Sequence, residues 1–187
     1  MEPDKRTPEQ YAVVLDFLPN GYPFDKRPSH KKTPIVQALG TSHFTLLEMS
    51  PKEGVFLQPH EQVYIGEGLR DKVQHVLGRI PLSKLTQTAK AELEFAITEV
   101  VSKNEKPFVE FFNKAQPLTT RMHQLELLPG VGKKHMWEII EARQVKLFES
   151  LADIKARVRL LPDAKKVIVR RILLEIEEQD KRKLFTD

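Results

Sequence analysis

The chain has 187 residues, 40% of them hydrophobic and 30% charged, so a folded core is expected and general disorder is not. It contains no cysteine, which excludes disulfides and thiolate zinc sites and is typical of a reducing compartment. The N-terminal residues Met1 to Arg6 are charged and lack the apolar stretch of a secretory signal. No run approaches the roughly 18 apolar residues of a membrane span. We therefore expect a cytoplasmic protein.

The net charge of +4 is unevenly distributed along the chain. Lys and Arg balance Asp and Glu at 10 against 10 in residues 1–82 and at 5 against 5 in residues 83–116. Residues 117–187 hold 15 against 11, and the window 133–172 within them holds 11 against 5. This basic concentration favours nucleic acid as a partner, with a solvated helical surface as the plain alternative.

The first part of the chain predicts a small β domain over residues 1–82. Segments rich in β-forming residues alternate there with turn signals such as Pro19-Asn20-Gly21. The expected strands are Tyr11–Leu18, Ile35–Leu39, His43–Met49, Val55–Leu57 and Gln62–Ile65. Val73–Ile80 fits either a further strand or a single helical turn. Five or six short strands indicate a small antiparallel barrel of the OB-like or SH3-like type.

A basic loop follows the first expected strand. Lysine, arginine and histidine occupy five of the seven positions from 26 to 32. In an OB-like barrel such a loop often contacts nucleic acid, whereas the alternative is a flexible solvated loop. The candidate binding residues in it are Lys26, Arg27, Lys31 and Lys32.

The second part predicts an all-helical region over residues 83–187, which makes the fold α+β. Thr86 to Thr88 offer N-caps for a helix whose apolar residues recur at helical spacing up to Val101. A second helix starts at Pro107, and we expect its phenylalanines to lie in the core. Pro117 ends it, and Leu118–Leu127 begins the next helix.

The run Leu-Pro-Gly-Val-Gly-Lys-Lys at 128–134 is the most informative stretch of the chain. Gly130 and Gly132 permit positive φ angles, and we expect both to form a tight turn before a helix. The first N–H groups of a helix have no partner within it and lie at the positive end of the dipole, so they attract anions. With Lys133 and Lys134 beside them, phosphate is the expected ligand.

A weaker copy of this run follows 33 positions later at 161–166, with one residue deleted and both glycines lost. Helical patterns precede and follow each copy, so the two units can share one core. We expect the second turn to pack rather than to bind. After it, Lys166 and Arg170 are four residues apart and share a helix face, so with Lys165 they extend a phosphate track or form a solvated face.

The segment 128–134 resembles the first hairpin of the helix-hairpin-helix superfamily, and the degenerate second copy resembles the tandem form of that motif. The resemblance implies sequence-independent binding of a nucleic-acid backbone and a possible monovalent cation held by hairpin carbonyls. The residues that it assigns to phosphate binding are Gly130, Val131, Gly132, Lys133 and Lys134.

Over nearly its full length the chain is also similar to domain-of-unknown-function family 655, an uncharacterised archaeal family predicted to bind RNA. The similarity includes the stretches Val63–Gly68 and His123–Leu128. It implies a β-barrel followed by a helical region and favours RNA over DNA as the partner, without assigning a reaction.

Two alternatives remain open. Some helix-hairpin-helix proteins are DNA glycosylase–lyases, whose nucleophilic lysine falls at Lys134, but Asp153 lies one residue beyond the matching acidic position, which Ala152 occupies. A protein-interaction adaptor in a ribosomal or repair complex is the other, and exposed phenylalanines in the second helix would favour it. We expect Trp137 in the core and Glu175 on a solvated helix end. The prediction is a non-catalytic, RNA-binding protein without a metal site.

Overall fold

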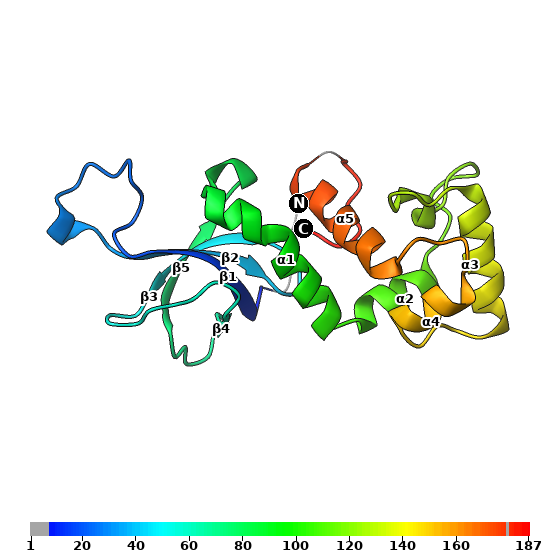
Figure 1. The fold of residues 1–187 in the computed structure, drawn as a ribbon, viewed down its shortest axis with the longest axis horizontal. Helices are drawn as coiled ribbons and strands as arrows, with labels where there is room; N and C mark the ends of the chain where they lie inside the picture. The colour runs from blue at the N-terminus through cyan, green and yellow to red at the C-terminus, as the bar shows by residue number, and fades with distance from the viewer. Residues whose placement is uncertain (1–7, 179) are drawn as a thin grey trace, which may run out of the picture. The chain divides into compact units, whose positions relative to one another are not determined.

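The computed structural model describes residues 8–178 and 180–187 and shows an α+β protein (Figure 1). Met1 to Arg6, where no secretory signal is expected, lie outside the described residues. A curled five-stranded antiparallel sheet, a half-barrel, is followed by five α-helices. The strand order is β4-β1-β2-β3-β5. The strands are β1 (Tyr11–Leu18), β2 (Ile35–Gly40), β3 (Leu46–Pro51), β4 (Gln62–Tyr64) and β5 (Val73–Arg79).

The prediction of a strand is confirmed for β1, β2, β3 and β4, and Val73–Ile80 is resolved as the strand β5. Val55–Leu57 was expected as a strand and is not one. Its backbone is used in turns, since the Val55 N–H bonds to the Lys52 carbonyl at 3.1 Å and Gly54 adopts φ +73°. Leu57 is nevertheless fully buried. The apolar residues of this segment therefore indicated correctly that it is buried, but not whether its backbone pairs with another strand.

The half-barrel is open between its edge strands. Among the described residues no ladder joins β4 to β5, and β4 is only three residues long. An irregularity between Val14 and Asp16 shifts the register of β1 against β2, and bulges of this kind bend a sheet. One face of the sheet carries a buried cluster with members from all five strands: Ala12, Val14, Val36, Ala38, Leu47, Met49, Leu57, Val63, Ile65 and Val73.

Hydrogen bonds with buried Gln37 and half-buried Asp16 fix the start of the first helix against β1 and β2. Gln37 is fully buried, and its amide accepts the Thr86 N–H at 2.8 Å and donates to the Lys84 carbonyl at 3.0 Å. The Thr86 hydroxyl donates to Asp16 at 2.6 Å and accepts the Ala89 N–H at 3.0 Å. Thr86 is therefore an N-cap, as its sequence context predicts.

The helices begin and end close to the expected positions, with one exception. Only the last four residues of the expected helix Leu118–Leu127 are helical, as a short 3₁₀ turn. Pro117 instead bridges to His123, and the Leu118 N–H bonds to the Met122 carbonyl at 2.8 Å. The helices are η1 (Ser29–Lys31), η2 (Leu82–Lys84), α1 (Gln87–Lys103), α2 (Lys106–Lys114), η3 (Gln124–Leu127), α3 (Lys133–Val145), α4 (Leu151–Arg157) and α5 (Ala164–Ile176).

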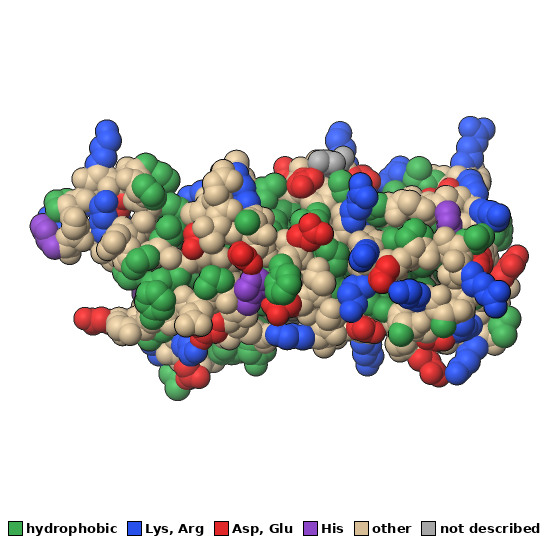
Figure 2. Space-filling view, viewed as in Figure 1, with side chains coloured by type: hydrophobic (Ala, Val, Ile, Leu, Met, Phe, Trp, Pro, Cys, Tyr) green, Lys and Arg blue, Asp and Glu red, His purple; other side chains and the backbone are tan. Residues whose placement is uncertain are grey.

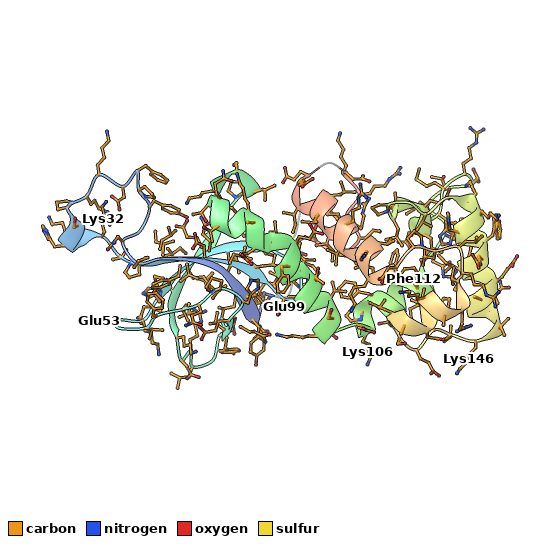
Figure 3. The ribbon with its side chains drawn as sticks, viewed as in Figure 1. Lys32, Glu53, Glu99, Lys106, Phe112 and Lys146 are labelled. Atoms are coloured by element: carbon orange, nitrogen blue, oxygen red, sulfur yellow. The ribbon has the colours of Figure 1, made fainter. Side chains whose placement is uncertain are left out.

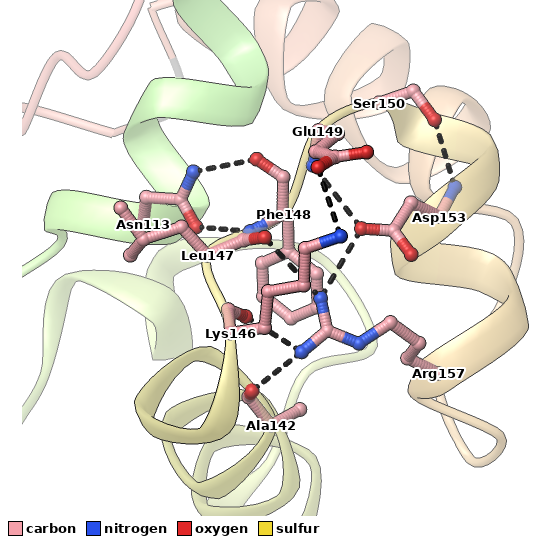
Figure 4. A network of polar contacts seen from close by, with 9 residues as sticks. All are labelled: Asn113, Ala142, Lys146, Leu147, Phe148, Glu149, Ser150, Asp153 and Arg157. Atoms are coloured by element: carbon pink, nitrogen blue, oxygen red, sulfur yellow. Dashed lines mark hydrogen bonds and ion pairs between the residues drawn. The ribbon is translucent and has the colours of Figure 1, made fainter.

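Arginines bind the carbonyl ends of helices in the C-terminal part. Arg143 donates to the carbonyls of Phe112 and Ala115 at 2.9 and 3.0 Å, at the end of α2. Arg157 donates to the carbonyls of Ala142 and Lys146, both at 2.6 Å, at the end of α3 (Figure 4). The final carbonyls of a helix are short of partners within it, so these contacts add hydrogen bonds at the ends of α2 and α3.

Phe108 and Phe112 of α2 are buried, as predicted, whereas Phe111, also expected in the core, is half-buried. Phe112 is labelled on α2 in Figure 3. The chain divides into two compact units. Unit 1 holds the residues up to Ala96 together with Arg182–Asp187, and unit 2 holds Ile97–Lys181. No helix in residues 8–178 and 180–187 is long and apolar enough to span a bilayer.

Candidate nucleic-acid interface

The turn between η3 and α3 exposes backbone between two buried side chains. Leu128 and Val131 are 1% and 6% exposed, and the Val131 N–H bonds to the Leu128 carbonyl at 3.1 Å. Between them Gly130 adopts φ +78°, and a Cβ placed on it would meet no atom within 4 Å. Val131 thus anchors the turn in the core, while the backbone at Gly130 faces open space.

Gly132 has a different role from the one expected. Its φ is −96° and its ψ −174°, an extended conformation open to any residue, so the prediction of positive φ is correct for Gly130 and wrong for Gly132. The Gly132 N–H bonds to Nδ1 of His135 at 3.2 Å. A Cβ at Gly132 would have His135 Nδ1, at 3.9 Å, as its nearest neighbour. Glycine at this position therefore leaves the approach to α3 clear.

The first amides of α3 are available to a ligand. The first backbone bond of the helix runs from the Met136 N–H to the Gly132 carbonyl at 3.0 Å. No such bond uses the N–H groups of Lys133 and Lys134 within the described structure, and no side chain caps them. Together with the positive end of the helix dipole, they form an anion-attracting surface.

The two lysines at this helix start differ in their surroundings. Lys133 Nζ lies 2.6 Å from the Arg121 carbonyl and 3.1 Å from the Glu126 carboxylate. Lys133 therefore links the start of α3 to the segment that contains Arg121 and Glu126. The His123 N–H and, after it, Lys133 lower the pKa of Glu126 and keep that carboxylate charged. Lys134 is exposed and has no ion pair to any described residue. Lys134 is therefore the cation free to meet a phosphate.

Trp137 is 56% exposed, so its expected place in the core is wrong. Met136 and Ile139 supply the buried contacts of α3 instead. Trp137 lies three residues after Lys134, and residues at this spacing are neighbours on a helix surface. The indole therefore lies one helical turn beyond the candidate phosphate site.

The second turn, before α5, is closed by a carboxylate. Asp163 is the N-cap of α5 and accepts the N–H groups of Lys165 and Lys166 at 3.0 and 3.3 Å. Although burial opposes its ionisation, these bonds and the charge of Lys155 lower the pKa of Asp163. An anion of the protein itself thus occupies the place of a ligand. The helix N-caps Gly132 and Asp163 are 31 residues apart, so the structural repeat is shifted by two from the sequence match.

The basic residues after the second turn are divided between surface and core. Lys166 and Arg170 are exposed and four apart, as the proposed track requires, and Lys165 is half-buried. Arg171 is only 3% exposed and donates to buried Glu175 at 2.8 Å and to the Leu127 carbonyl at 3.0 Å. The expectation that Glu175 lies on a solvated helix end is therefore wrong, because it is the buried partner of Arg171.

The loop between β1 and β2 places its basic side chains on the surface. Lys26, Arg27 and Lys31 are exposed and Lys32 is half-buried. Arg27 forks onto Asp25 at 2.7–3.1 Å, and this contact lowers the pKa of Asp25 to about 2. Figure 2 shows lysine and arginine side chains both on this loop and over the helices of unit 2.

Sequence reasoning missed Phe24 in the same loop. Its side chain is 72% exposed and stacks on Tyr22 at a centroid distance of 4.9 Å. The signal available in the sequence was weak: two aromatic residues, Tyr22 and Phe24, between a glycine turn and a basic run.

The arrangement offers little to the lyase alternative. Asp153 pairs with Arg157 at 3.1 Å and accepts the Glu149 N–H at 3.1 Å, so it stabilises the start of α4 (Figure 4). Lys134 is exposed instead of enclosed in a pocket that would favour its free amine. Across the described ranges no group of His, Asp and Glu is arranged to hold a metal ion.

Comparisons with other proteins find similar proteins in archaea. The uncharacterised protein MJ0038 of Methanocaldococcus jannaschii is 47% identical over 186 residues, which cover 98% of this chain and 82% of the relative. The crystal structure of Af1531 from Archaeoglobus fulgidus, attributed to DUF655, is similar with a TM-score of 0.89 and 49% identity, over 96% of this chain and 100% of that chain. A family model described as "Protein of unknown function (DUF655)" matches residues 8–187. The resemblance to family 655 is therefore confirmed, and the chain belongs to the DUF655 family.

Proposed function

We propose that this protein binds nucleic acid, with RNA as the natural ligand, through the backbone of the turn at 128–134 acting as a helix-hairpin-helix. The observation that carries the proposal is the contrast between the two turns. The first leaves Gly130 and the amides of α3 open, whereas Asp163 fills the equivalent position of the second.

In the proposed complex, phosphate oxygens accept the N–H groups of Lys133 and Lys134, and the Lys134 ammonium neutralises the charge. Lys166 and Arg170 extend the basic surface along α5. These groups contact phosphate and not base edges, so binding is independent of sequence. RNA is preferred over DNA on the resemblance to family 655, and both are included in the test.

The hairpin carbonyls also bear on the proposed monovalent cation. The carbonyls of Leu127 and Leu128 already accept hydrogen bonds, from Arg171 and from the Val131 N–H. Those of Pro129, Gly130 and Val131 accept none in the described part of the chain and could serve as oxygen ligands. A cation there would add positive charge beside the phosphate.

Lys134→Glu tests the proposal. Charge reversal beside the bound phosphate should weaken binding of RNA and DNA about tenfold at low salt, because one phosphate contact becomes repulsive. Trp137 is the chain's single tryptophan and lies one turn from Lys134, so its emission reports binding at the hairpin. Lys90→Glu is the matched control, since Lys90 is an exposed lysine of α1. Equal affinity of Lys134→Glu and Lys90→Glu would contradict the proposal.

Gly132→Val separates backbone capture from side-chain charge. The φ of −96° suits valine, so the fold should survive, while the new side chain covers the approach to the first amides of α3. We expect affinity to fall at least as far as in Lys134→Glu. Unchanged affinity in a titration followed by fluorescence anisotropy would show that the lysines alone bind.

The alternative function, a protein-interaction adaptor, lacks the exposed phenylalanines that were expected to support it. Exposed phenylalanines in α2 would have favoured it, but Phe108 and Phe112 are 5% and 0% exposed and Phe111 is half-buried.

A further inference from the structure

The loop between β1 and β2 presents one aromatic ring on a fixed support. The rings of Phe24 and Tyr22 stack with an angle of 11° between their planes, and Phe24 is 72% exposed whereas Tyr22 is 7% exposed. The Tyr22 carbonyl accepts the Asp25 N–H at 3.0 Å, which closes a tight turn around Phe24. One face of Phe24 is therefore covered by Tyr22, and its remaining surface is open to solvent.

The support itself is held by a buried polar network. The Tyr22 hydroxyl donates to Glu48 at 2.5 Å and accepts the Gln37 amide at 3.0 Å. Lys84 pairs with Glu48 at 2.8 Å and lies 5.3 Å from the centre of the Tyr22 ring. A ring fixed in this way loses little conformational freedom when a flat ligand stacks on its neighbour.

The charges around Phe24 favour an anionic ligand. Lys26 and Lys31 are exposed and without an ion pair in the described structure, and Lys32 is half-exposed beside them. Asp25 is the only acidic residue between 21 and 34, and Arg27 already neutralises it. An aromatic face with cations around it is the arrangement that binds single-stranded nucleic acid, in which bases stack and phosphates pair with lysines.

We propose that Phe24, supported by Tyr22, stacks an unpaired nucleobase of single-stranded RNA while Lys26, Lys31 and Lys32 contact the flanking phosphates. The inference takes its ligand class from the proposed function but places it on a second surface. Phe24 is the only large hydrophobic residue between 23 and 34. One ring suits one base, whereas a loop that enters a lipid surface or docks on protein needs a wider apolar patch.

The test measures binding of a fluorescent oligouridylate and of an RNA duplex at low salt. Phe24→Leu keeps apolar bulk but removes the π face, so we expect affinity for the single strand to fall roughly 5- to 150-fold. Affinity for the duplex should change little, because its bases are already stacked. Phe24→Tyr restores the ring and should restore binding. Photo-crosslinking with 4-thiouridylate should label the peptide that contains Phe24.

Equal single-strand affinity of Phe24→Leu and the unmodified protein would overturn the inference, as would an equal loss for the duplex. Vesicles of anionic lipid form a separate arm, in which retention that depends on Phe24 without any effect on RNA would also overturn it. The hairpin is tested independently. If Gly132→Val binds RNA normally while Phe24→Leu does not, the hairpin mechanism fails and base stacking on Phe24 is supported. If Phe24→Leu binds normally while Gly132→Val does not, the stacking proposal fails and the hairpin mechanism is supported.

Discussion

At the scale of single residues, burial divides side chains that the sequence presents as alike. Arg170 and Arg171 are neighbours in a basic run, yet Arg170 is exposed and Arg171 is buried against Glu175. Arg171 also donates to the Leu127 carbonyl, immediately before the hairpin. Its guanidinium therefore joins α5 to the residue from which the candidate phosphate site begins.

Removal of Arg171 should destabilise the protein strongly. Arg171→Met removes the buried cation that pairs with Glu175 at 2.8 Å and with Asp180 at 3.0 Å, and losses of about 3–5 kcal/mol in the free energy of unfolding are typical when one member of a buried ion pair is removed. Urea unfolding followed by circular dichroism measures the loss. The double variant Arg171→Met, Glu175→Leu removes the buried pair and should recover much of the loss, because the remaining carboxylate, Asp180, is 35% exposed. A double variant no more stable than the single one would contradict this account.

The role of a residue could be predicted from the sequence where that role depends on the residue itself and its immediate neighbours. The Thr86 cap and the positive φ of Gly130 follow from the residues themselves and their immediate neighbours. The exposure of Trp137 and Phe24 did not follow, because it depends on which face of the structure remains uncovered after packing. The closure of the second turn by Asp163 was also missed, although aspartate is a common N-cap.

At the scale of elements, the periodicity of apolar residues identified the segments that pack in the core. Contacts with other segments decided whether each one is a strand, a helix or a turn. The bounds of β1 match the expectation fully, because its alternation ends at a strong turn signal. Leu118–Leu127 failed as a helix because Pro117 pairs with His123 across a turn, a contact between residues that no helical spacing relates. His123 then caps η3 by accepting the Leu125 N–H at 3.1 Å.

The cap formed by His123 makes the hairpin sensitive to acid. Burial, followed by the charge of Arg143, lowers the pKa of His123 below its ordinary 6.5. A depressed pKa means that the neutral form stabilises the fold above about pH 6.5 and that this stabilisation is lost as the pH falls through the lowered value. Thermal unfolding between pH 7 and pH 5 should show the decline.

His123→Asn is the matched control for this pH dependence. Asparagine can accept the same Leu125 N–H as an N-cap but does not titrate. The variant should therefore lose less stability than the unmodified protein between pH 7 and pH 5. Parallel curves for the two proteins would show that another group is responsible. The pKa itself can be measured by NMR from the imidazole shifts.

At the scale of the whole molecule, each unit carries its own candidate surface, the loop with Phe24 in unit 1 and the hairpin in unit 2. The fold class and the order of sheet and helices could be predicted from the sequence, since they depend on local patterns. An open, partly closed barrel was also expected, but the identity of its edge strands, β4 and β5, could not be predicted, because strand pairing joins residues far apart in the chain.

Two surfaces on one RNA should have additive effects on the salt dependence of binding. Each phosphate contact on a single strand contributes about −0.7 to the slope of log affinity against log salt. Each lysine replaced by glutamine should make this slope less negative by about 0.7, both in Lys134→Gln and in the double variant Lys31→Gln, Lys32→Gln. Together they should give the sum of both reductions. A combined variant with the slope of Lys134→Gln alone would show that the loop lies outside the contact.

The return of Arg182–Asp187 to unit 1 has a consequence for the order in which the protein is made. Asp187 pairs with Arg79 at 3.3 Å and with His43 at 3.4 Å. Those contacts join residues that leave the ribosome before and after all of unit 2. Unit 2 is thus an insertion within unit 1. During synthesis, the contacts of Asp187 with the half-barrel can form only after all of unit 2 has been made.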